Sequence, residues 1–351
     1  MPDLGRVAIL TPYLPSSRPG GVEVFTTELA AALGGARIFA PTREASSASG
    51  ALSHLGLEQP VRALGPAHAF REAHRRKPFD VVISNGLCGW PLSLSPFAGP
   101  AVQVYHFTFA GLARKALPRG DRLTTGRVTG FFDRLAGTGK TVVAVSESVR
   151  REVSALYGHQ ARVLPNGVDM DLFRRTERDE ARDSIGLPRG PPVGLFVGRS
   201  EHAKGFDFVQ TVAQARKDVL FACVSAPAPA PSNVRFFTDV PHDRMPRFYS
   251  AADFLLLPSR YEGFNLSLLE ALACDLPTVT SAEAYPFGDG PPRLATVVEP
   301  LTRDGLLQAI QGVLERGRPE NLRERIVQEY SLDAFRRRWV ELVRGLVAGQ
   351  S

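Results

Sequence analysis

The chain has 351 residues, with 42 Lys and Arg against 36 Asp and Glu for a formal charge of +6, and it is 44% hydrophobic and 22% charged. This length suits two domains of similar size, and this composition is typical of a soluble globular protein and excludes intrinsic disorder. No stretch approaches the roughly 18 uninterrupted apolar residues that a membrane-spanning helix needs.

The N-terminus and the cysteines bear on the compartment. MPDLGRVAIL runs directly into an apolar stretch and lacks the basic start and cleavage site of a secretory signal. Cys88, Cys223 and Cys274 are far apart and odd in number, which indicates neither a disulfide framework nor a metal site. We therefore expect a cytoplasmic protein, with peripheral attachment to the inner face of the membrane as an alternative.

Charge is unevenly divided between the two halves. Residues 1–175 hold 21 basic and 13 acidic side chains, whereas residues 176–351 hold 21 and 23. A cationic first half suggests an anionic partner, which charge alone leaves open among a phosphorylated ligand, a membrane surface and a nucleic acid. No nucleic-acid-binding module is recognised, so no nucleic acid is expected.

In the first half, short apolar runs alternate with helix-like segments, the pattern of βα units that build a parallel sheet. The predicted strands are Val7–Leu10, Arg37–Ala40, Asp80–Ser84, Ala101–Phe107, Thr141–Ser146 and Ala161–Leu164. The predicted helices are Val22–Leu33, Ala67–Arg76 and Glu147–Tyr157. These elements predict one doubly wound domain over residues 1–170.

The stretch Asp169–Gly190 is polar and charged and is followed by two prolines, which favours a linker. The alternation then restarts. The predicted strands are Val193–Val197, Val219–Val224, Val234–Phe237, Phe254–Pro258, Pro277–Thr280 and Thr296–Val298, and the predicted helices are Gly205–Arg216, Asp243–Ala251, Leu266–Ala273 and Arg303–Glu315. A second doubly wound domain is expected over residues 171–330.

A final helix is predicted over residues 331–351, with Ser331 as its cap and apolar residues at helical spacing. Its apolar face needs a partner, and we expect it to cross back to the first domain. Two Rossmann-like domains in tandem predict a central cleft between the carboxyl ends of two sheets, where the ligands of such sheets bind.

The strongest motif is YEGFNLSLLEALACDLPTVTS, residues 261–281, which follows a buried-looking strand. Glu262 lies just past the strand, and Phe264, Asn265 and Leu266 begin a helix whose free N–H groups favour a phosphate. Glu270 lies eight positions after Glu262, so the two would share one quadrant if the helix reached back that far. Carboxylates beside a phosphate are better placed on hydroxyl groups that flank it.

Three further segments fit a ligand with phosphate and hydroxyl groups. In LFVGRSEHAKGFD, residues 195–207, Arg199 and Lys204 follow a strand and are suited to hold a diphosphate. Gly20 and Gly21 precede the first helix, where a flexible backbone approaches a ligand closely. His106 ends the fourth predicted strand and is expected to face the cleft.

Two basic stretches remain, residues 68–79 and 111–137, and Phe131 and Phe132 lie among the basic residues of the second. A solvated face is the simplest interpretation of both. Recognition of an acceptor or of a membrane surface is the alternative.

The string from Glu262-Gly263-Phe264 to Glu270-Ala271-Leu272 resembles the E-x7-E signature of retaining glycosyltransferases of family 4, which have the GT-B fold. The G-R…K-G segment at 198–205, the GGVE loop and the N-G-V-D segment at 166–169 are also similar to that family. The resemblance implies a metal-independent, retaining hexosyltransferase that needs no cofactor besides its nucleotide-sugar donor.

The resemblance also implies roles for individual residues. Arg199, Lys204 and the N–H groups after Glu262 would hold the diphosphate. Glu262 and His106 would contact the donor sugar, and Glu270 the ribose. Gly20, Gly21, Gly263, Phe264, Asn265 and Leu266 would line the donor site, with no metal ligands. The acceptor stays open between a small natural product, a lipid-linked molecule and a glycan of the cell envelope.

Three departures from the family pattern stand out. Asn265 and Asp275 replace residues that are usually glycine, and the segment SAEAYPFGDGPPR, residues 281–293, lacks a glycine-rich loop. Two alternatives therefore stay open. One is another enzyme with this fold, such as a nucleotide-sugar hydrolase or epimerase, and the other is a non-catalytic protein that binds nucleotide-sugars or polyanions.

Overall fold

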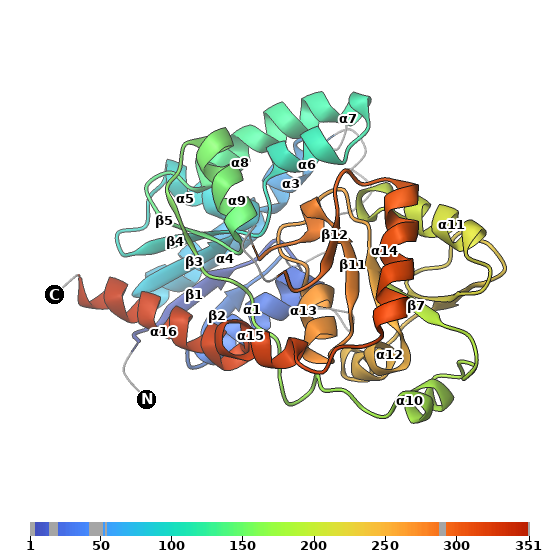
Figure 1. The fold of residues 1–351 in the computed structure, drawn as a ribbon. Coiled ribbons are helices and arrows are strands. Elements are labelled where there is room, and N and C mark those ends of the chain that lie inside the picture. The colour runs from blue at the N-terminus through green and yellow to red at the C-terminus, as the bar shows by residue number, and fades with distance from the viewer. Residues whose placement is uncertain (1–3, 14–19, 42–51, 53–54, 288–292, 350–351) are drawn as a thin grey trace. The chain divides into compact units, whose positions relative to one another are not determined.

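The computed structural model describes residues 4–13, 20–41, 52, 55–287 and 293–349. The chain divides into two compact units, Met1–Asn166 with Phe335–Ser351, and Gly167–Ala334. Each unit is built around one parallel sheet, as the alternation of strands and helices predicts (Figure 1).

The sheet of the first unit has the strand order β2-β1-β3-β4-β5-β6, with every neighbouring pair parallel. Its strands are β1 (Val7–Leu10), β2 (Arg37–Phe39), β3 (Val81–Asn85), β4 (Ala101–Tyr105), β5 (Thr141–Ala144) and β6 (Ala161–Val163). Strands β1 and β3 are buried along their whole length, which explains why VAIL and VVI read as continuous apolar runs.

The helices of the first unit join these strands. They are α1 (Gly21–Ala32), α3 (Glu58–Arg62), α4 (Leu64–Arg76), α5 (Trp90–Leu94), α6 (Phe109–Lys115), α7 (Arg119–Leu123), α8 (Gly130–Ala136) and α9 (Glu147–Glu152). A 3-10 turn, η1 (Gly86–Gly89), follows β3, and two π-helical turns, η2 (Thr124–Thr129) and η3 (Val153–Tyr157), continue α7 and α9. Several of these segments are too short for a helical period to mark them in the sequence.

The sheet of the second unit has the order β12-β11-β10-β7-β8-β9, again all parallel. Its strands are β7 (Val193–Val197), β8 (Leu220–Val224), β9 (Val234–Phe237), β10 (Phe254–Leu257), β11 (Thr278–Ser281) and β12 (Thr296–Val298). Strand order reverses between β7 and β10, and ligands of such sheets bind outside the carboxyl ends of the strands at that switch point.

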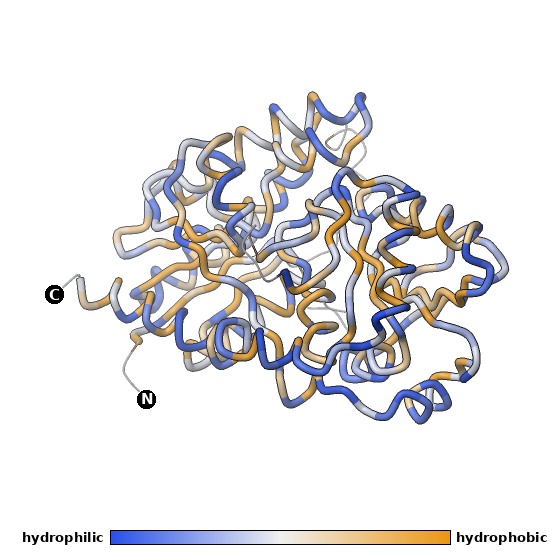
Figure 2. Tube along the Cα trace, in the orientation of Figure 1, coloured by the Kyte–Doolittle hydropathy of each residue, from blue (hydrophilic) through white to orange (hydrophobic). Residues whose placement is uncertain are grey.

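The helices of the second unit cover both faces of its sheet. They are α10 (Arg178–Ser184), α11 (Phe206–Ala215), α12 (Met245–Ala251), α13 (Leu266–Ala273), α14 (Arg303–Arg316) and α15 (Leu322–Tyr330), with 3-10 turns η4 (His202–Lys204), η5 (His242–Arg244) and η6 (Ala282–Ala284). Leu255 and Leu257 of β10 pack in the core with α12 and α13, while Phe254 and Leu256 pack with α11 and α14. Alternate side chains of a strand point to opposite faces, so one apolar run supplies two cores. In Figure 2 the strands are largely orange and α10 is largely blue.

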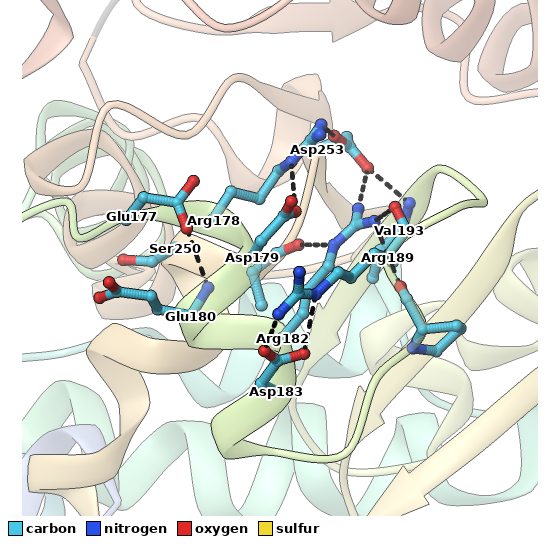
Figure 3. A network of polar contacts seen from close by, with 12 residues as sticks. Glu177, Arg178, Asp179, Glu180, Arg182, Asp183, Arg189, Val193, Ser250 and Asp253 are labelled. Carbon is cyan, nitrogen blue, oxygen red and sulfur yellow. Dashed lines mark hydrogen bonds and ion pairs between the residues drawn. The ribbon is translucent and has the colours of Figure 1, made fainter.

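The expected linker at 169–190 is wrong as a description of that segment. It contains α10, and Arg182 on that helix is only 1% exposed. The Arg182 guanidinium donates to the carboxylate of Asp253 at 2.7 Å and to the carbonyls of Ala251 and Arg189 at 2.9 and 2.7 Å (Figure 3). The segment looks like a linker because its charges find partners only in the folded unit.

The final helix is α16 (Leu332–Ala348). Its first residues belong to the second unit, and from Phe335 onward it belongs to the first unit. Phe335 and Trp339 are buried and contact the ring of Phe25 on α1 edge-on, with centroids 5.5 and 5.7 Å apart. Arg336 also pairs with Glu28 at 3.0 Å. The expected return of this helix to the first domain is confirmed.

Candidate active site

Lys204 and Glu262 meet at the switch point of the second sheet. Lys204 lies in η4, shortly after β7, and Glu262 lies in the loop after β10, the neighbouring strand. The Lys204 Nζ is 2.6 Å from the Glu262 Oε1, and the same oxygen accepts hydrogen bonds from Ser259 Oγ at 3.0 Å and Asn265 Nδ2 at 3.2 Å. Their side chains are 27% and 11% exposed, so the pair is sheltered but reachable.

The two loops that carry this pair are tied together. Gly205 has φ +70°, and a Cβ there would lie 1.9 Å from the carbonyl oxygen of Pro258, so only glycine fits. The backbone N–H of Arg260 donates to the carbonyl of Ala203, and its guanidinium donates to both carboxylate oxygens of Asp207 at 2.7 Å. These contacts fix the spacing of Lys204 and Glu262.

Arg199 lies in the same loop after β7, but the described contacts do not bring it onto Glu262. Its side chain is 74% exposed and pairs with Glu201 at 3.1 Å. An exposed pair of this kind contributes little to stability, so the guanidinium is available to an anionic ligand at little cost.

Asn265 caps helix α13. Its Oδ1 accepts from the backbone N–H of Leu268 at 3.2 Å, and its φ of −85° is an ordinary extended value. No glycine is needed at this position. Asp275 differs, because its φ of +53° lies in the left-handed region, and its Oδ1 accepts from the backbone N–H of Arg323 at 2.9 Å.

Glu270 is buried within α13, and both of its oxygens have partners in the second unit. Its Oε1 lies 2.9 Å from His242 Nε2, and its Oε2 accepts from the hydroxyl of Tyr249 at 2.6 Å. Because α13 begins at Leu266, it does not reach back to Glu262, and the two carboxylates have separate sets of partners.

His106, Gly20 and Gly21 lie at the carboxyl edge of the first sheet. His106 follows β4, and its Nε2 lies 2.9 Å from Asn85 Oδ1 at the end of β3. Burial lowers the pKa of His106 to about 3, which keeps the ring neutral near pH 7. Gly20 is the N-cap of α1, and its N–H donates to the carboxylate of Glu23 at 2.6 Å, while Gly21 begins the helix.

Some predicted features fall only partly on described residues. The loop before Gly20 includes residues 14–19, and the segment 281–293 includes residues 288–292, all of which lie outside the described part of the chain. Among the described residues no three His, Cys, Asp or Glu side chains are grouped as metal ligands, and no described helix is long and apolar enough to cross a membrane.

Comparison with known proteins follows the division into two units. The sequence pattern of glycosyltransferase family 4 matches residues 19–172, and that of the glycosyl transferases group 1 matches residues 191–316. The chain is 29% identical to the D-inositol 3-phosphate glycosyltransferase of Xylanimonas cellulosilytica, over 79% of this chain and 80% of that protein. The chain is a glycosyltransferase, and its first unit matches glycosyltransferase family 4.

Solved structures agree on the fold of this glycosyltransferase. The sucrose-phosphate synthase of Thermosynechococcus elongatus superposes with a TM-score of 0.82 at 21% identity, over 98% of this chain and 100% of that one. Anabaena Alr3699/HepE in complex with UDP-glucose superposes with a TM-score of 0.73 at 18% identity, over 97% and 100%. The GT-B fold is therefore confirmed, and nothing in these matches supports a hydrolase or epimerase.

Several partners around the site of the glycosyltransferase were not found by sequence reasoning. Ser259, Arg260, His242 and Tyr249 each hold a carboxylate or a loop of the site. Ser259 and Arg260 directly follow the β10 run, which is a usable signal. His242 and Tyr249 carry no such signal, because they reach Glu270 from a different element.

The second basic stretch forms α6, α7, η2 and α8 of the glycosyltransferase. Leu123 and Phe131 are 60% and 61% exposed on it, whereas Phe132 packs against Trp90 with ring centroids 4.9 Å apart. The two phenylalanines that are adjacent in the sequence therefore have different environments.

The His242–Glu270 contact makes stability depend on pH. The hydrogen bond that His242 donates to the Glu270 carboxylate raises the pKa of His242 above its usual value of 6.5. A raised folded-state pKa stabilises the protein fully below the unfolded pKa, and that stability is lost as pH rises through the folded pKa. We expect the free energy of unfolding of wild type to exceed that of His242→Gln by more at about pH 5.5 than at about pH 8.5.

Denaturant titrations at the two pH values test this expectation. In a Glu270→Gln background the effect of His242→Gln should lose its pH dependence, since the carboxylate that holds the imidazolium is gone. The assignment is contradicted if, in protein that retains Glu270, His242→Gln changes the free energy of unfolding equally at both pH values.

Proposed function

We propose that this glycosyltransferase moves a hexose from a nucleoside-diphosphate sugar to an acceptor hydroxyl with retention of configuration, and that it needs neither a metal ion nor a further cofactor. A UDP-hexose is the first donor to test, because the HepE structure contains UDP-glucose. Residues 171–330 would form the nucleotide-sugar domain and residues 1–170 the acceptor domain.

The observation that carries the proposal is the Lys204–Glu262 pair at the switch point of the second sheet. The ammonium has three donors, and Glu262 takes one of them. The other two are left for phosphate oxygens, so the charge order becomes carboxylate, ammonium, phosphate, and Glu262 is not repelled by the ligand. Arg199 would supply a second, movable cation from the same loop.

Together these groups would stabilise the charge that develops on the leaving diphosphate. Two cations and the N–H groups at the start of α13 take the role that a metal ion has in other enzymes. Glu262 has a second oxygen, Oε2, for a hydroxyl of the donor sugar. Glu270, held by His242 and Tyr249, would accept from the ribose.

The acceptor is proposed to be anionic. The first half carries an excess of eight basic side chains, and the Xylanimonas relative is named for inositol 3-phosphate. A rate that falls steeply with salt for a phosphorylated acceptor, but not for its dephosphorylated form, would support this class of acceptor.

Calorimetry with UDP, dTDP and GDP tests the donor site. Wild type should bind one of them with micromolar to millimolar affinity, and Lys204→Ala should weaken it by about 10- to 100-fold, because a charge-assisted hydrogen bond is lost. Lys217→Ala is the matched control, an exposed lysine of the same unit, and should bind as wild type does. Absence of binding to all three nucleotides would contradict the proposal.

Turnover completes the test. Product that forms from a UDP-hexose only in the presence of an acceptor, and at the same rate after treatment with EDTA, fits a metal-independent transferase. A rate abolished by EDTA and restored by a divalent cation would overturn the metal-independent part.

A further inference from the structure

A buried chain of polar side chains lies behind His106. Thr26 on α1 is 3% exposed and Asn85 at the end of β3 is fully buried. Asn85 Nδ2 lies 3.3 Å from Thr26 Oγ1, and Asn85 Oδ1 lies 2.9 Å from His106 Nε2. All three residues belong to the first unit, and β3 pairs directly with β4, which carries His106 at its end.

The directions of these hydrogen bonds follow from another one, which the Thr26 hydroxyl makes within its own helix. The Thr26 hydroxyl donates to the carbonyl of Val22 at 2.7 Å, so its proton is already used and its oxygen must accept from Asn85. The amide nitrogen of Asn85 therefore faces Thr26, and its oxygen faces His106. An amide oxygen only accepts, so Nε2 of His106 carries the proton and Nδ1 carries a lone pair.

The surroundings keep the ring of His106 in place and neutral. The ring of Phe25 packs edge-on against it with centroids 4.6 Å apart, and desolvation lowers the pKa of the imidazole. His106 also lines a small pocket of the first unit, with Tyr13 and Asp133 as its other titratable side chains. Burial raises the pKa of Asp133 to about 7.

We propose that Thr26 and Asn85 are positioning residues that hold His106 as its Nε2–H tautomer, so that Nδ1 presents a lone pair to a sugar hydroxyl in this pocket. This inference rests on the proposed function for its substrate. A neutral ring with this fixed tautomer accepts a hydrogen bond from the hydroxyl, whereas the opposite tautomer, or the imidazolium, would place a donor against that hydroxyl. A buried amide costs free energy unless it is hydrogen-bonded, and the positioning of His106 explains why the Asn85 amide is buried behind the ring.

Nitrogen NMR of protein labelled with 15N in histidine reads the tautomer without any substrate. The signal that disappears in His106→Asn should show Nε2–H and an unprotonated Nδ1 from about pH 6 to pH 8. Thr26→Val leaves the Asn85 amide free to flip and should produce a mixture of tautomers, and Thr26→Ser should restore one. An Nδ1–H tautomer in wild type would overturn the proposal.

Kinetics test the consequence for the reaction. Thr26→Val should lower kcat/KM by about 2- to 12-fold, the value of one hydrogen bond, and Thr26→Ser should restore it. Thr129→Val is the matched control, because Thr129 is also 3% exposed in the first unit and donates to a carbonyl, of Gly56. It should change neither the tautomer nor the kinetics. A Thr26→Val protein that melts earlier but keeps the wild-type tautomer and kcat/KM would show a merely structural role and overturn the proposal.

Asn85→Asp provides an independent variant. The carboxylate still accepts from Nε2 but favours the imidazolium, so His106 should become protonated near neutral pH and kcat/KM should fall there and recover as pH rises. An Asn85→Asp protein that keeps wild-type kinetics while its His106 is protonated would also overturn the proposal.

Two further measurements are needed. One identifies whether the donor or the acceptor carries the hydroxyl, and the other distinguishes failure of this inference from failure of the proposed function. If the hydroxyl belongs to the donor sugar, Thr26→Val will raise the KM for the UDP-hexose and slow its hydrolysis without acceptor. If it belongs to the acceptor, only the acceptor KM will rise. Should wild type bind and turn over no nucleotide-sugar, the proposed function fails, and so does the substrate role of Nδ1, while the NMR result still decides the tautomer.

Discussion

Replacement of Glu262 by Gln is expected to lower kcat/KM for transfer from the donor by about 100- to 1,000-fold, the size of effect found when a group that stabilises developing charge is lost. The amide keeps the shape of the side chain but removes the charge that holds the Lys204 ammonium at 2.6 Å. Under the proposed mechanism, Lys204 then loses its fixed position next to the leaving group. Initial rates with the donor identified by calorimetry measure the effect.

The control for this variant is Glu324→Gln, which changes an exposed carboxylate on α15 of the same unit. It should keep the wild-type rate. Circular dichroism and thermal melting should show that Glu262→Gln folds, because the pair is partly open to solvent. A folded Glu262→Gln protein with near-normal kcat/KM would remove Glu262 from the proposed mechanism.

Replacement of Arg182 by Ala is expected to destabilise the protein by about 3–5 kcal/mol, since it leaves the partner charge of a buried ion pair uncompensated. The guanidinium is 1% exposed, and its loss strands Asp253 and the carbonyls of Ala251 and Arg189 (Figure 3). Arg178 remains 3.1 Å from Asp253, which favours the lower end of this range. Denaturant-induced unfolding gives the free energy.

Arg189→Ala is the matched control, because Arg189 is 62% exposed where it pairs with Asp183. An exposed pair contributes at most about 1 kcal/mol, so this variant should stay close to wild type. Adding Asp253→Asn to Arg182→Ala should recover part of the loss by removing the stranded charge. Equal stabilities of the Arg182 and Arg189 variants would mean that the buried network does not hold the segment.

The net charge of each half of the chain does not locate the site. The cationic first half pointed to an anionic partner but could not distinguish among the classes. The two cations proposed to meet the diphosphate, Arg199 and Lys204, lie in the half that is slightly acidic overall. Net charge describes a whole surface, whereas a site depends on the position of single side chains.

Asn265 and Asp275 show what a family pattern leaves open. Both stand where a glycine is usual, yet only Asp275 adopts a left-handed backbone, and Asn265 uses its side chain to cap α13 and to reach Glu262. The sequence marks both positions equally. Only the backbone angles separate a strained site from an ordinary one.

The sequence by itself determined the two parallel sheets, the position of their strands and the return of the final helix, because the burial of apolar runs and the helical period are local patterns. It also marked the loops after β7 and β10, since both directly follow a buried strand. The strand positions need no knowledge of which segments meet, whereas the return of the final helix was inferred from an apolar face that needs a partner.

Only the tertiary structure decided the partners. Lys204 meets Glu262 across 58 positions of sequence, His242 meets Glu270 across 28, and Asn85 meets His106 across 21. Arg182 meets Asp253 across 71, which turns an apparent linker into a packed helix. The sequence marked Lys204, Glu262, Glu270 and His106 as site residues but did not pair them, and it placed Arg182 in an apparent linker. The fold sets strands side by side and buries the charges, and a buried polar group is stable only with the partner that the fold brings to it.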